Sequence, residues 1–415
     1  MASFKLRLWS CSIIFKREVI SLLEKLRLKD FLRKVIVEKR SKSSISISSG
    51  KDDVKVKEKV ILVLPNIPWD FRKQRPQQMF SRLAKRGFTV FYCNPITSSA
   101  DGVREVSEGV YELSVRCSEH RNILREFDLS DSFVKEYVTA VKDILKKYVN
   151  TECFLFVLHP VWGRFVKGFG DCKLVYDMMD LYSGFPDAKK ELVESEEELV
   201  RNSDMVVTTA DSLYEYAKGL NSNVHIVKNG CDFDLFSTPK KNGLLDSLCE
   251  KPVIGYYGAL NDWVDVELLK YVVSKNMDKY FVFIGAINSS KFRRLYRYSN
   301  VFFLGEVDNR DLVGYLAYFD VCTIPFVLND LIRSTNPVKF YEYIASCRPV
   351  VSVRLPELEV YDDICYLSDT KEEFENDICK ALEEDSKGLR ERRKKVAMEN
   401  SWDSRVDELV KVLLV

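Results

Sequence analysis

From residue 57 onward, short apolar runs alternate with segments of helical length. The first series of runs reads VILVLPN, TVFYCNP, CFLFVLH, KLVYDMMD, DMVVTTA and VHIVKNG, and a helix is predicted over about residues 74–85 after the first run. A second series reads PVIGYYG, YFVFIG, VFFLG, DVCTIPF and PVVSV. Continuous apolar strands separated by helices are typical of parallel sheets covered on both faces. The pattern therefore predicts an α/β protein with two doubly wound, Rossmann-like domains.

The two series divide the chain near residues 237–251. We expect an N-terminal domain over residues 51–240 and a C-terminal domain over residues 241–398. Residues 399–415 are predicted to form a terminal helix, with Val406, Leu409, Val410 and Leu413 on one side. In such sheets ligands bind outside the carboxyl ends of the strands. Two domains that face each other are thus expected to form a cleft with two half-sites.

Residues 1–50 are interpreted as a basic amphipathic arm and a linker. The segments FKREVISLLEKL and LKDFLRKVIVEK each place apolar residues on one helical stripe, and a break is expected near residues 27–30. Residues 1–48 hold 12 Lys and Arg against four Asp and Glu. Such an arm could lie on an anionic membrane surface, or it could pack on the body or on a partner chain. The Ser-rich stretch RSKSSISISSGKDD reads as a flexible linker.

The composition is that of an ordinary globular protein. Its 415 residues are 46% hydrophobic and 30% charged, and the net charge of +1 gives no overall bias toward nucleic acid. The eleven cysteines show no CxxC spacing, so we expect unpaired thiols in a reducing cytosol. With three histidines, no structural zinc site is expected. No run is long enough for a membrane-spanning helix and none resembles a signal peptide, which favours a cytoplasmic location.

The stretch STNPVKFYEY is unusual in its electrostatics. Asn336 is predicted to cap a helix whose first residue is Pro337. Lys339 then falls in the first turn, where the helix dipole disfavours a cation and favours an anion. Lys339 and Glu342 are predicted on a polar face, opposite an apolar face that includes Phe340. Either the two charges serve a binding site or they form an ordinary surface pair.

The loop PNIPWDFRKQRPQQ leaves the first strand and enters a helix. Its position places Trp69, Asp70, Arg72, Gln74 and Arg75 at the cleft end of the predicted sheet. Arginine forks grip phosphates and aromatic faces pack on sugar rings, so the loop suits sugar and phosphate recognition. Asp70 is a candidate general base toward an acceptor hydroxyl. The alternative is a capped helix entry with Trp69 as a hydrophobic plug.

Two further residues end strands and are thereby directed to the cleft. His159 follows FVL and is a candidate catalytic residue, although a lone histidine is often structural. Gly258 ends VIGYYG, where the absence of a Cβ atom would let the next loop approach a phosphate. A structural turn remains the alternative for Gly258.

The order of these motifs resembles glycosyltransferases of the two-Rossmann GT-B architecture, in particular the bacterial family 4-like enzymes that build cell-surface polysaccharides. The donor domain of that family is similar to IGYYGALNDWVDVELL, NVFFLGEVDNRDLVGYLAYFDVCTIPF and STNPVKFYEYIASCRPVVS. In the first half, IPWDFRKQRPQQMFSRLAKRGFTVFYCNP and KLVYDMMDLYSGF resemble the teichuronic-acid type. The resemblance covers roughly residues 57–412.

The resemblance also implies roles for individual residues. Glu342 matches the second Glu of the family's Glu-x7-Glu signature and is expected to accept hydrogen bonds from the nucleotide ribose, while Ser334 replaces the first Glu. The helix start at Asn336 would supply amides for the pyrophosphate. The loop ALNDWVD lacks the basic residues that many relatives place there, so Lys339 and Arg333 are the expected neutralising cations.

In the first domain, Asp177 and Asp180 resemble the family's acidic pair. They are expected to bind acceptor hydroxyls or to orient a cation, with helix capping as the alternative. The turn at Asn229 and Gly230 is expected near the cleft, with a structural turn as the alternative.

These features predict a glycosyltransferase that moves a sugar from a nucleoside-diphosphate sugar to a hydroxyl of a glycan or lipid-linked glycan. The resemblance implies retention at the anomeric carbon, no cofactor and no metal. Two alternatives stay open: a nucleotide-sugar epimerase, and a non-catalytic scaffold that binds a partner through its N-terminal arm. The replacement of a signature Glu by Ser334 gives the scaffold alternative some weight.

Overall fold

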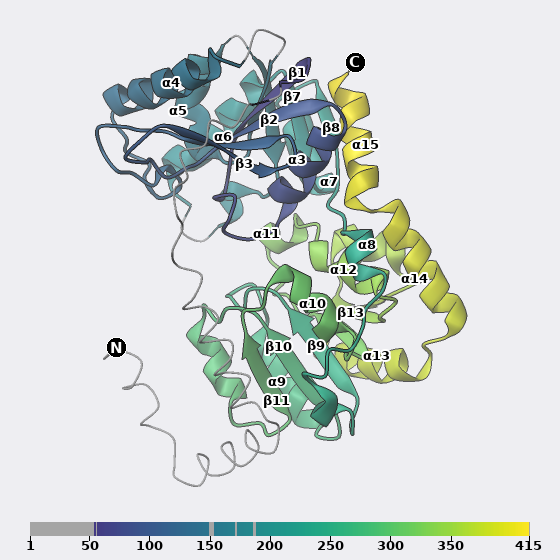
Figure 1. The fold of residues 1–415 in the computed structure, drawn as a ribbon. Helices are drawn as coiled ribbons and strands as arrows, with labels where there is room; N and C mark the ends of the chain where they lie inside the picture. The colour runs from purple at the N-terminus through teal and green to yellow at the C-terminus, as the bar shows by residue number, and fades with distance from the viewer. Residues whose placement is uncertain (1–53, 55, 149–152, 171, 186–187, 415) are drawn as a thin grey trace. The chain divides into compact units, whose positions relative to one another are not determined.

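The computed structural model describes residues 54, 56–148, 153–170, 172–185 and 188–414, and the predicted N-terminal arm lies outside this range. Residues 52–415 form one compact unit. Its described strands build two sheets, one of eight strands and one of six (Figure 1). The two series of apolar runs therefore correspond to two separate sheets, as the sequence predicts.

The N-terminal sheet has the strand order β3-β4-β2-β1-β5-β6-β7-β8. Its central strands are parallel, and in their register Ile61 lies opposite Val90 on one side and Phe154 on the other. The strands are β1 Lys59–Leu64, β2 Phe88–Cys93, β3 Gly102–Ser107, β4 Val110–Ser114, β5 Cys153–Val157, β6 Lys173–Met178, β7 Met205–Thr208 and β8 Val224–Ile226.

An edge hairpin makes this sheet mixed instead of purely parallel. Strands β3 and β4 pair antiparallel, and the turn between them contains Gly109 at φ +73°. Positive φ at a two-residue hairpin turn favours glycine. Strand β3 is half-exposed to exposed along its length, so it has no apolar run. The apolar runs of the sequence therefore did not indicate β3, and the antiparallel hairpin was not predicted.

The C-terminal sheet has the order β11-β10-β9-β12-β13-β14, and all its strand pairs are parallel. Five of its strands coincide with the second series of apolar runs. The sixth, β14, has three residues and is too short for a pattern to reveal it. The strands are β9 Val253–Tyr257, β10 Tyr280–Ile284, β11 Val301–Gly305, β12 Val321–Ile324, β13 Val350–Val353 and β14 Tyr366–Ser368.

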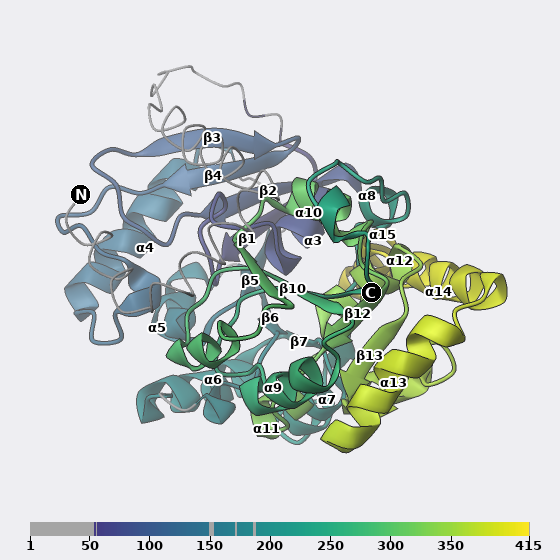
Figure 2. The same ribbon diagram turned by 90° about the horizontal axis from the view of Figure 1, so that it is seen from below.

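Helices connect most of the parallel strands, because a parallel pair needs a long crossover connection. Near the chain end, α14 lies beside α12 (Figure 2). The helices are α3 Arg75–Lys85, α4 Asp131–Leu145, α5 Gly163–Val166, α6 Lys190–Asn202, α7 Asp211–Lys218, α8 Phe233–Phe236, α9 Val266–Lys275, α10 Asn309–Leu316, α11 Asp330–Arg333, α12 Val338–Ala345, α13 Lys371–Glu383, α14 Lys387–Glu399 and α15 Trp402–Leu413.

The terminal helix α15 packs on the N-terminal sheet, although it follows the C-terminal sheet in the sequence. Its apolar side chains Trp402, Val406 and Leu409 join the buried cluster that contains Phe80 of α3. Arg82 of α3 adds an ion pair to the first turn of α15. The last helix therefore ties the two sheets together.

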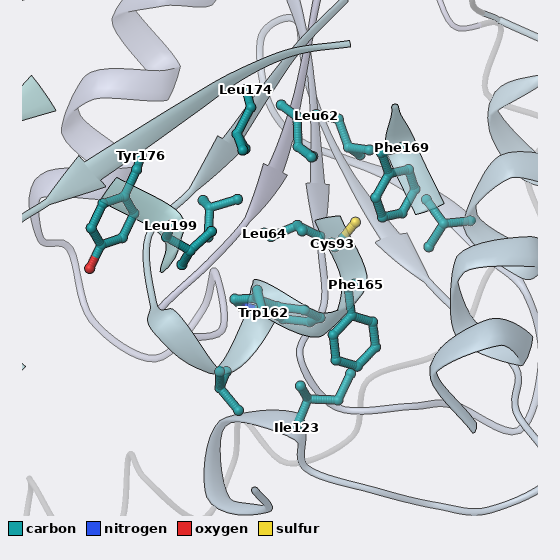
Figure 3. Close-up of a cluster of buried hydrophobic side chains, with 14 of the residues drawn as sticks. Leu62, Leu64, Cys93, Ile123, Trp162, Phe165, Phe169, Leu174, Tyr176 and Leu199 are labelled. Carbon is teal, nitrogen blue, oxygen red and sulfur yellow. The ribbon is translucent and has the colours of Figure 1, made fainter. Parts of the chain in front are cut away.

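The opposite face of the N-terminal sheet carries the larger buried cluster (Figure 3). Trp162 is fully buried there and donates from Nε1 to the carbonyl oxygen of Pro65, at 2.7 Å. Leu62 and Leu64 of β1 face this cluster, while Ile61 and Val63 face the cluster around α3. Central strands buried on both faces explain the uninterrupted apolar runs of the sequence.

Cysteine pairing differs from the sequence-based expectation at one place. Cys153 begins β5 and Cys172 directly precedes β6, the neighbouring strand. Their Cα atoms are 4.6 Å apart, and the two side chains are joined in a disulfide. The expectation that all cysteines are unpaired is therefore wrong for this pair, because the parallel register of β5 and β6 brings together two residues that are 19 positions apart in the sequence.

Among the described helices, none is long and apolar enough to cross a membrane.

Cys347 has an unfavourable backbone conformation. It is the one non-glycine residue with positive φ among the described residues, at +59°. The left-handed region costs an L-residue about 1–2 kcal/mol. We expect Cys347→Gly to raise the free energy of unfolding by about 1 kcal/mol in urea denaturation. Cys347→Ala is the control, because it removes the thiol and keeps the strain. Equal stability of the two variants would contradict this account.

Candidate functional site

The loop after β1 places its aromatic residue in the core. Trp69 is buried edge-to-face against Tyr92, with ring centroids 5.1 Å apart. Its carbonyl oxygen accepts a hydrogen bond from Gln77 Nε2 at 3.0 Å. Gln74 caps α3 by a reciprocal capping box with Gln77. In this structure the loop thus has the geometry of the alternative interpretation, a capped helix entry with Trp69 as a plug.

Two charged residues of the same loop form exposed ion pairs. Asp70 accepts from Arg104 of β3 at 2.6 Å, and Arg104 also contacts Glu112 of β4 at 2.7 Å. Arg72 pairs with Glu306, which follows β11 of the other sheet, at 2.8 Å. The carboxylate of Asp70 is therefore directed toward the edge hairpin, and Arg72 links the two sheets.

Arg75 and Asp177 form a buried ion pair. The guanidinium donates from Nη2 and Nε to the two carboxylate oxygens of Asp177, at 2.8 and 3.0 Å. Nη1 donates to the carbonyl oxygen of Val227 at 3.0 Å and to Asn229 Oδ1 at 3.3 Å. The sequence predicted both residues at the cleft end of the sheet. The structure brings them together, with the guanidinium enclosed by protein partners.

His159 and Asp180 lie after the adjacent strands β5 and β6. His159 Nδ1 accepts from the backbone N–H of Val161 at 3.1 Å, and burial lowers the pKa of His159 to about 4. A neutral imidazole that accepts through Nδ1 carries its proton on Nε2. The ring lies edge-to-face on Tyr182, with centroids 4.8 Å apart.

Asp180 has no hydrogen bond or ion pair with any residue in the described ranges. Burial raises the pKa of its carboxyl group to about 6. The loop that carries it is held by Glu196 of α6, which accepts from the Tyr182 backbone N–H at 3.2 Å and from the Tyr176 hydroxyl at 2.9 Å. The sequence did not indicate this role of Glu196, because a glutamate among other acidic residues of a helix is expected on the solvent-exposed face.

A buried polar seam joins the loop after β8 to the segment before α12. Asn229 donates from its backbone N–H to Asn336 Oδ1 at 3.0 Å, and from Nδ2 to the Asn336 carbonyl oxygen at 2.8 Å. Asn336 Nδ2 donates to Glu357 Oε2 at 3.0 Å. Glu357 also accepts from Lys228 and from the backbone N–H of Asp211. The predicted turn at Asn229 thus contacts the predicted donor segment directly.

Helix α12 begins one residue later than predicted. Its N-cap is Pro337, and the side chain of Asn336 bonds to the seam instead of capping the helix. The polar face is not exposed, because Glu342, Tyr343 and Ser346 are all buried. The expectation of a free polar face fails since α8, α14 and β13 also contact the helix.

Lys339 is a half-buried cation at the start of this helix. Its Nζ lies over the rings of Phe326 and Tyr256, 4.6 and 5.5 Å from their centroids. It makes no hydrogen bond or ion pair with any residue that the structure describes. Burial lowers the pKa of Lys339 to about 8, against the attraction of Glu342. An ordinary surface pair between Lys339 and Glu342 is thereby ruled out.

Glu342 is buried one turn further along α12. Its Oε2 accepts from the Tyr257 hydroxyl at 2.6 Å, while Oε1 has no partner among the described side chains and backbone groups. Burial raises the pKa of Glu342 to about 7, although the bond from Tyr257 and the charge of Lys339 lower it. Tyr257 immediately precedes Gly258 at the end of β9, and sequence reasoning passed over it as a core strand residue.

Of the remaining donor candidates, Gly258 lies beside Lys339. Gly258 has φ +136°, and a Cβ atom there would lie 3.3 Å from Lys339 Cε. Ser334 is buried where α11 ends, and Arg333 is exposed beside it. The structure thus gathers Gly258, Lys339 and Glu342 at the carboxyl end of β9. In the described part of the chain, no three His, Cys, Asp or Glu side chains are grouped to hold a metal ion.

Comparison with known proteins identifies the C-terminal domain. Residues 251–384 match the family described as "Glycosyl transferases group 1". The chain is 22% identical over 307 residues to "Putative teichuronic acid biosynthesis glycosyltransferase TuaH" of Bacillus subtilis (strain 168), covering 69% of this chain and 77% of that protein. A glycosyltransferase domain and a relative with that name support a transferase enzyme.

Solved structures confirm the fold. Sucrose-phosphate synthase from Thermosynechococcus elongatus superposes with a TM-score of 0.69 at 15% identity, covering 86% of this chain and 98% of that chain. An α,α-trehalose 6-phosphate synthase from Burkholderia multivorans gives 0.65 at 11% identity, with coverage of 86% and 98%. The predicted two-Rossmann GT-B architecture is therefore confirmed.

The buried pair Arg75–Asp177 and the exposed pair Arg104–Asp70 predict different stability effects. Asp177→Asn leaves the buried Arg75 without its counter-charge, which should cost about 3–5 kcal/mol in urea unfolding. Asp70→Asn breaks an exposed pair and should cost less than about 1 kcal/mol. Similar losses in the two variants would contradict the assigned structural role of the Arg75–Asp177 pair.

Proposed function

We propose that this protein transfers a sugar from a nucleoside-diphosphate sugar to a hydroxyl group of a glycan or lipid-linked glycan. The observation that carries the proposal is a pair of opposite charges on α12 that do not contact each other, the half-buried Lys339 and the buried Glu342. Lys339 and Glu342 lie at the carboxyl end of β9, where ligands of open α/β sheets bind.

The ammonium of Lys339 is the feature that calls for an anionic ligand. A desolvated cation without a counter-ion is costly, and the cost falls when an anion binds. Lys339 belongs to the first turn of α12, where the free backbone amides and the positive end of the helix dipole also favour an anion. The ring stack on Phe326 and Tyr256 holds the ammonium near Gly258. A diphosphate satisfies the amides and the ammonium together.

The carboxylate of Glu342 supplies the second part of the donor site, the part that accepts hydrogen bonds from hydroxyl groups. Oε1 has no partner in the described part of the chain, and sugar hydroxyls are donors that a carboxylate accepts well. A ligand with a diphosphate and a neighbouring diol fits the spacing of one helical turn between Lys339 and Glu342. A nucleoside diphosphate has both groups.

We assign the binding site of the acceptor to the carboxyl ends of β5 and β6. Asp180 offers a carboxylate that has no partner among the described residues, and His159 is a neutral imidazole whose Nε2 proton faces away from its bond to Val161. Such groups bind sugar hydroxyls, so we assign them to acceptor binding. The relative TuaH is named for teichuronic acid biosynthesis, which supports a glycan acceptor.

The proposal includes retention at the anomeric carbon and charge neutralisation by Lys339 in place of a metal ion. A trehalose-6-phosphate synthase with the same fold, at a TM-score of 0.65 and 10% identity, is described as transferring with retention, and we extend that outcome to this chain as part of the proposal. When the bond to the leaving diphosphate breaks, negative charge grows on the phosphate oxygens. A preorganised cation and helix amides stabilise that charge.

A thermal-shift screen against UDP-, GDP-, dTDP- and CMP-sugars tests the proposal. A true donor at 100 times its Kd stabilises the fold by about 2.7 kcal/mol. Glu342→Gln should lose this shift while its unliganded Tm at pH 8 stays equal or rises. The reason is that the raised pKa of Glu342, about 7, makes the ionised form unfavourable in the folded state. This difference should shrink as the pH falls from 7 toward 4.5.

Asp246→Asn is the matched control, because Asp246 also accepts a tyrosine hydroxyl, from Tyr318 at 2.6 Å, outside the site. Its nucleotide-sugar shift should equal that of the unaltered protein. If no nucleotide sugar stabilises the unaltered protein, the transferase proposal fails and the scaffold alternative is favoured. A donor that is rearranged without any acceptor would favour the epimerase.

The phosphate role of Lys339 has its own test. Lys339→Met keeps an unbranched side chain between the two rings and removes the charge. We expect calorimetry at pH 7 to show roughly 10- to 100-fold weaker binding of the nucleoside diphosphate, since hydrogen bonds to charged groups contribute about 1.5–3 kcal/mol. Binding of the free nucleoside should not change.

Lys371→Met serves as the control for Lys339→Met. Lys371 also lies over an aromatic ring, that of Tyr271 at 4.8 Å, but it is on α13. Equal losses for diphosphate and nucleoside in Lys339→Met would show that the substitution disturbs the pocket and would refute the phosphate role.

A further inference from the structure

Tyr257 has a fixed position beside Glu342. Its hydroxyl donates to Glu342 Oε2 at 2.6 Å, and its backbone N–H donates to the hydroxyl oxygen of Tyr343 at 3.1 Å. The two rings meet edge-to-face, with centroids 4.8 Å apart. Both tyrosines are buried, Tyr257 on β9 and Tyr343 on α12. The phenol of Tyr257 therefore has little freedom to turn.

The hydroxyl of Tyr257 also restricts the carboxylate it contacts. The terminal torsion of a glutamate side chain is broad and roughly two-fold, so an unrestrained carboxylate has no fixed direction. Here one oxygen is held, and Oε1 is left without a partner in the described structure. The direction of Oε1 thus depends on the hydroxyl of Tyr257.

We propose that Tyr257 is a positioning residue of the donor site, whose hydroxyl fixes Glu342 so that Oε1 accepts from the vicinal hydroxyl groups of the donor's ribose. The inference rests on the proposed function for the identity of the ligand. Binding energy that is equal in the ground state and the transition state changes KM and leaves kcat unaltered. A ribose contact remote from the reacting bond belongs to this class.

The charges that face Glu342 come from several elements. Lys339 lies on the same helix, Lys73 precedes α3, and Asp232 precedes α8 and pairs with Lys73 at 3.1 Å. The buried thiol of Cys231 is also within electrostatic reach. The two lysines favour the carboxylate form, and burial and Asp232 oppose it. The hydroxyl of Tyr257 adds a hydrogen bond to the ionised form.

The pKa of Glu342 can show whether Tyr257 positions the carboxylate or only packs beside it. Tyr257→Phe keeps the ring contact with Tyr343 and removes the hydroxyl alone. Without that donor, the pKa of Glu342 should rise above its present value of about 7. Donor binding requires the ionised carboxylate, so its loss on acidification should begin at a higher pH in the variant.

The experiment compares the unaltered protein, Tyr257→Phe and Tyr318→Phe between pH 6 and 9. Tyr318 also donates to a carboxylate at 2.6 Å, that of Asp246, away from the site. For Tyr257→Phe we expect roughly a 10-fold higher donor KM at pH 7.5 with kcat within about two-fold, as for one lost hydrogen bond to a charged group. The pH midpoint of donor binding should move upward by about one unit. Tyr318→Phe should change neither quantity.

The outcomes separate this inference from the proposed function. If the unaltered protein binds no nucleotide sugar, the proposed function is overturned and the ribose assignment falls with it. If it binds a donor and Tyr257→Phe shows the same KM and the same midpoint, only the positioning role is overturned. A loss of kcat and of Tm at every pH, with an unmoved midpoint, would also overturn it, because that pattern indicates packing alone.

Discussion

The geometry of the donor helix depends on one buried amide, that of Asn336. Its oxygen accepts from the Asn229 backbone and its nitrogen donates to Glu357, while Asn229 Oδ1 accepts in turn from Arg75. Arg75 is held by Asp177 at the end of β6. A chain of satisfied hydrogen bonds thus runs from the N-terminal sheet to the start of α12. Displacing any member would leave a buried polar group unpaired, so the network specifies one arrangement.

After Asn336, helix α12 contains charged groups that are not paired in this way. Lys339 has no counter-ion and Glu342 has one unpartnered oxygen among the described residues, although both are desolvated. Natural proteins tend to break local rules of this kind at functional sites and to offset the cost elsewhere. The satisfied seam and the packed faces of α12 provide that offset here. Stability and binding are therefore assigned to adjacent segments of one short stretch of chain.

The sequence predicted the strands well because the central strands are buried on both faces and read as apolar runs. It predicted that Lys339 and Glu342 share one side of a helix, since that follows from the helical period. It did not predict that this side is buried, because the covering elements α8 and α14 are distant in sequence. The contact between Arg75 and Asp177 spans 102 positions and leaves no local pattern. Tyr257 was missed because it lies in an apolar run, where the sequence pattern indicates a core strand and gives no sign of a polar contact.

The replacement of a signature glutamate by Ser334 acquires a structural context from the loop after β6. Gly184 of that loop packs so closely on α11 that a Cβ atom would lie 3.1 Å from Leu331 Cβ. The loop that carries Asp180 therefore rests on the helix that ends beside Ser334. On the proposed function, the C-terminal sheet holds the nucleotide through Lys339 and Glu342, whereas Asp180 on the N-terminal sheet binds the acceptor. The position of the acceptor relative to the donor then depends on the contact between the sheets, which the buried seam at Asn336 maintains.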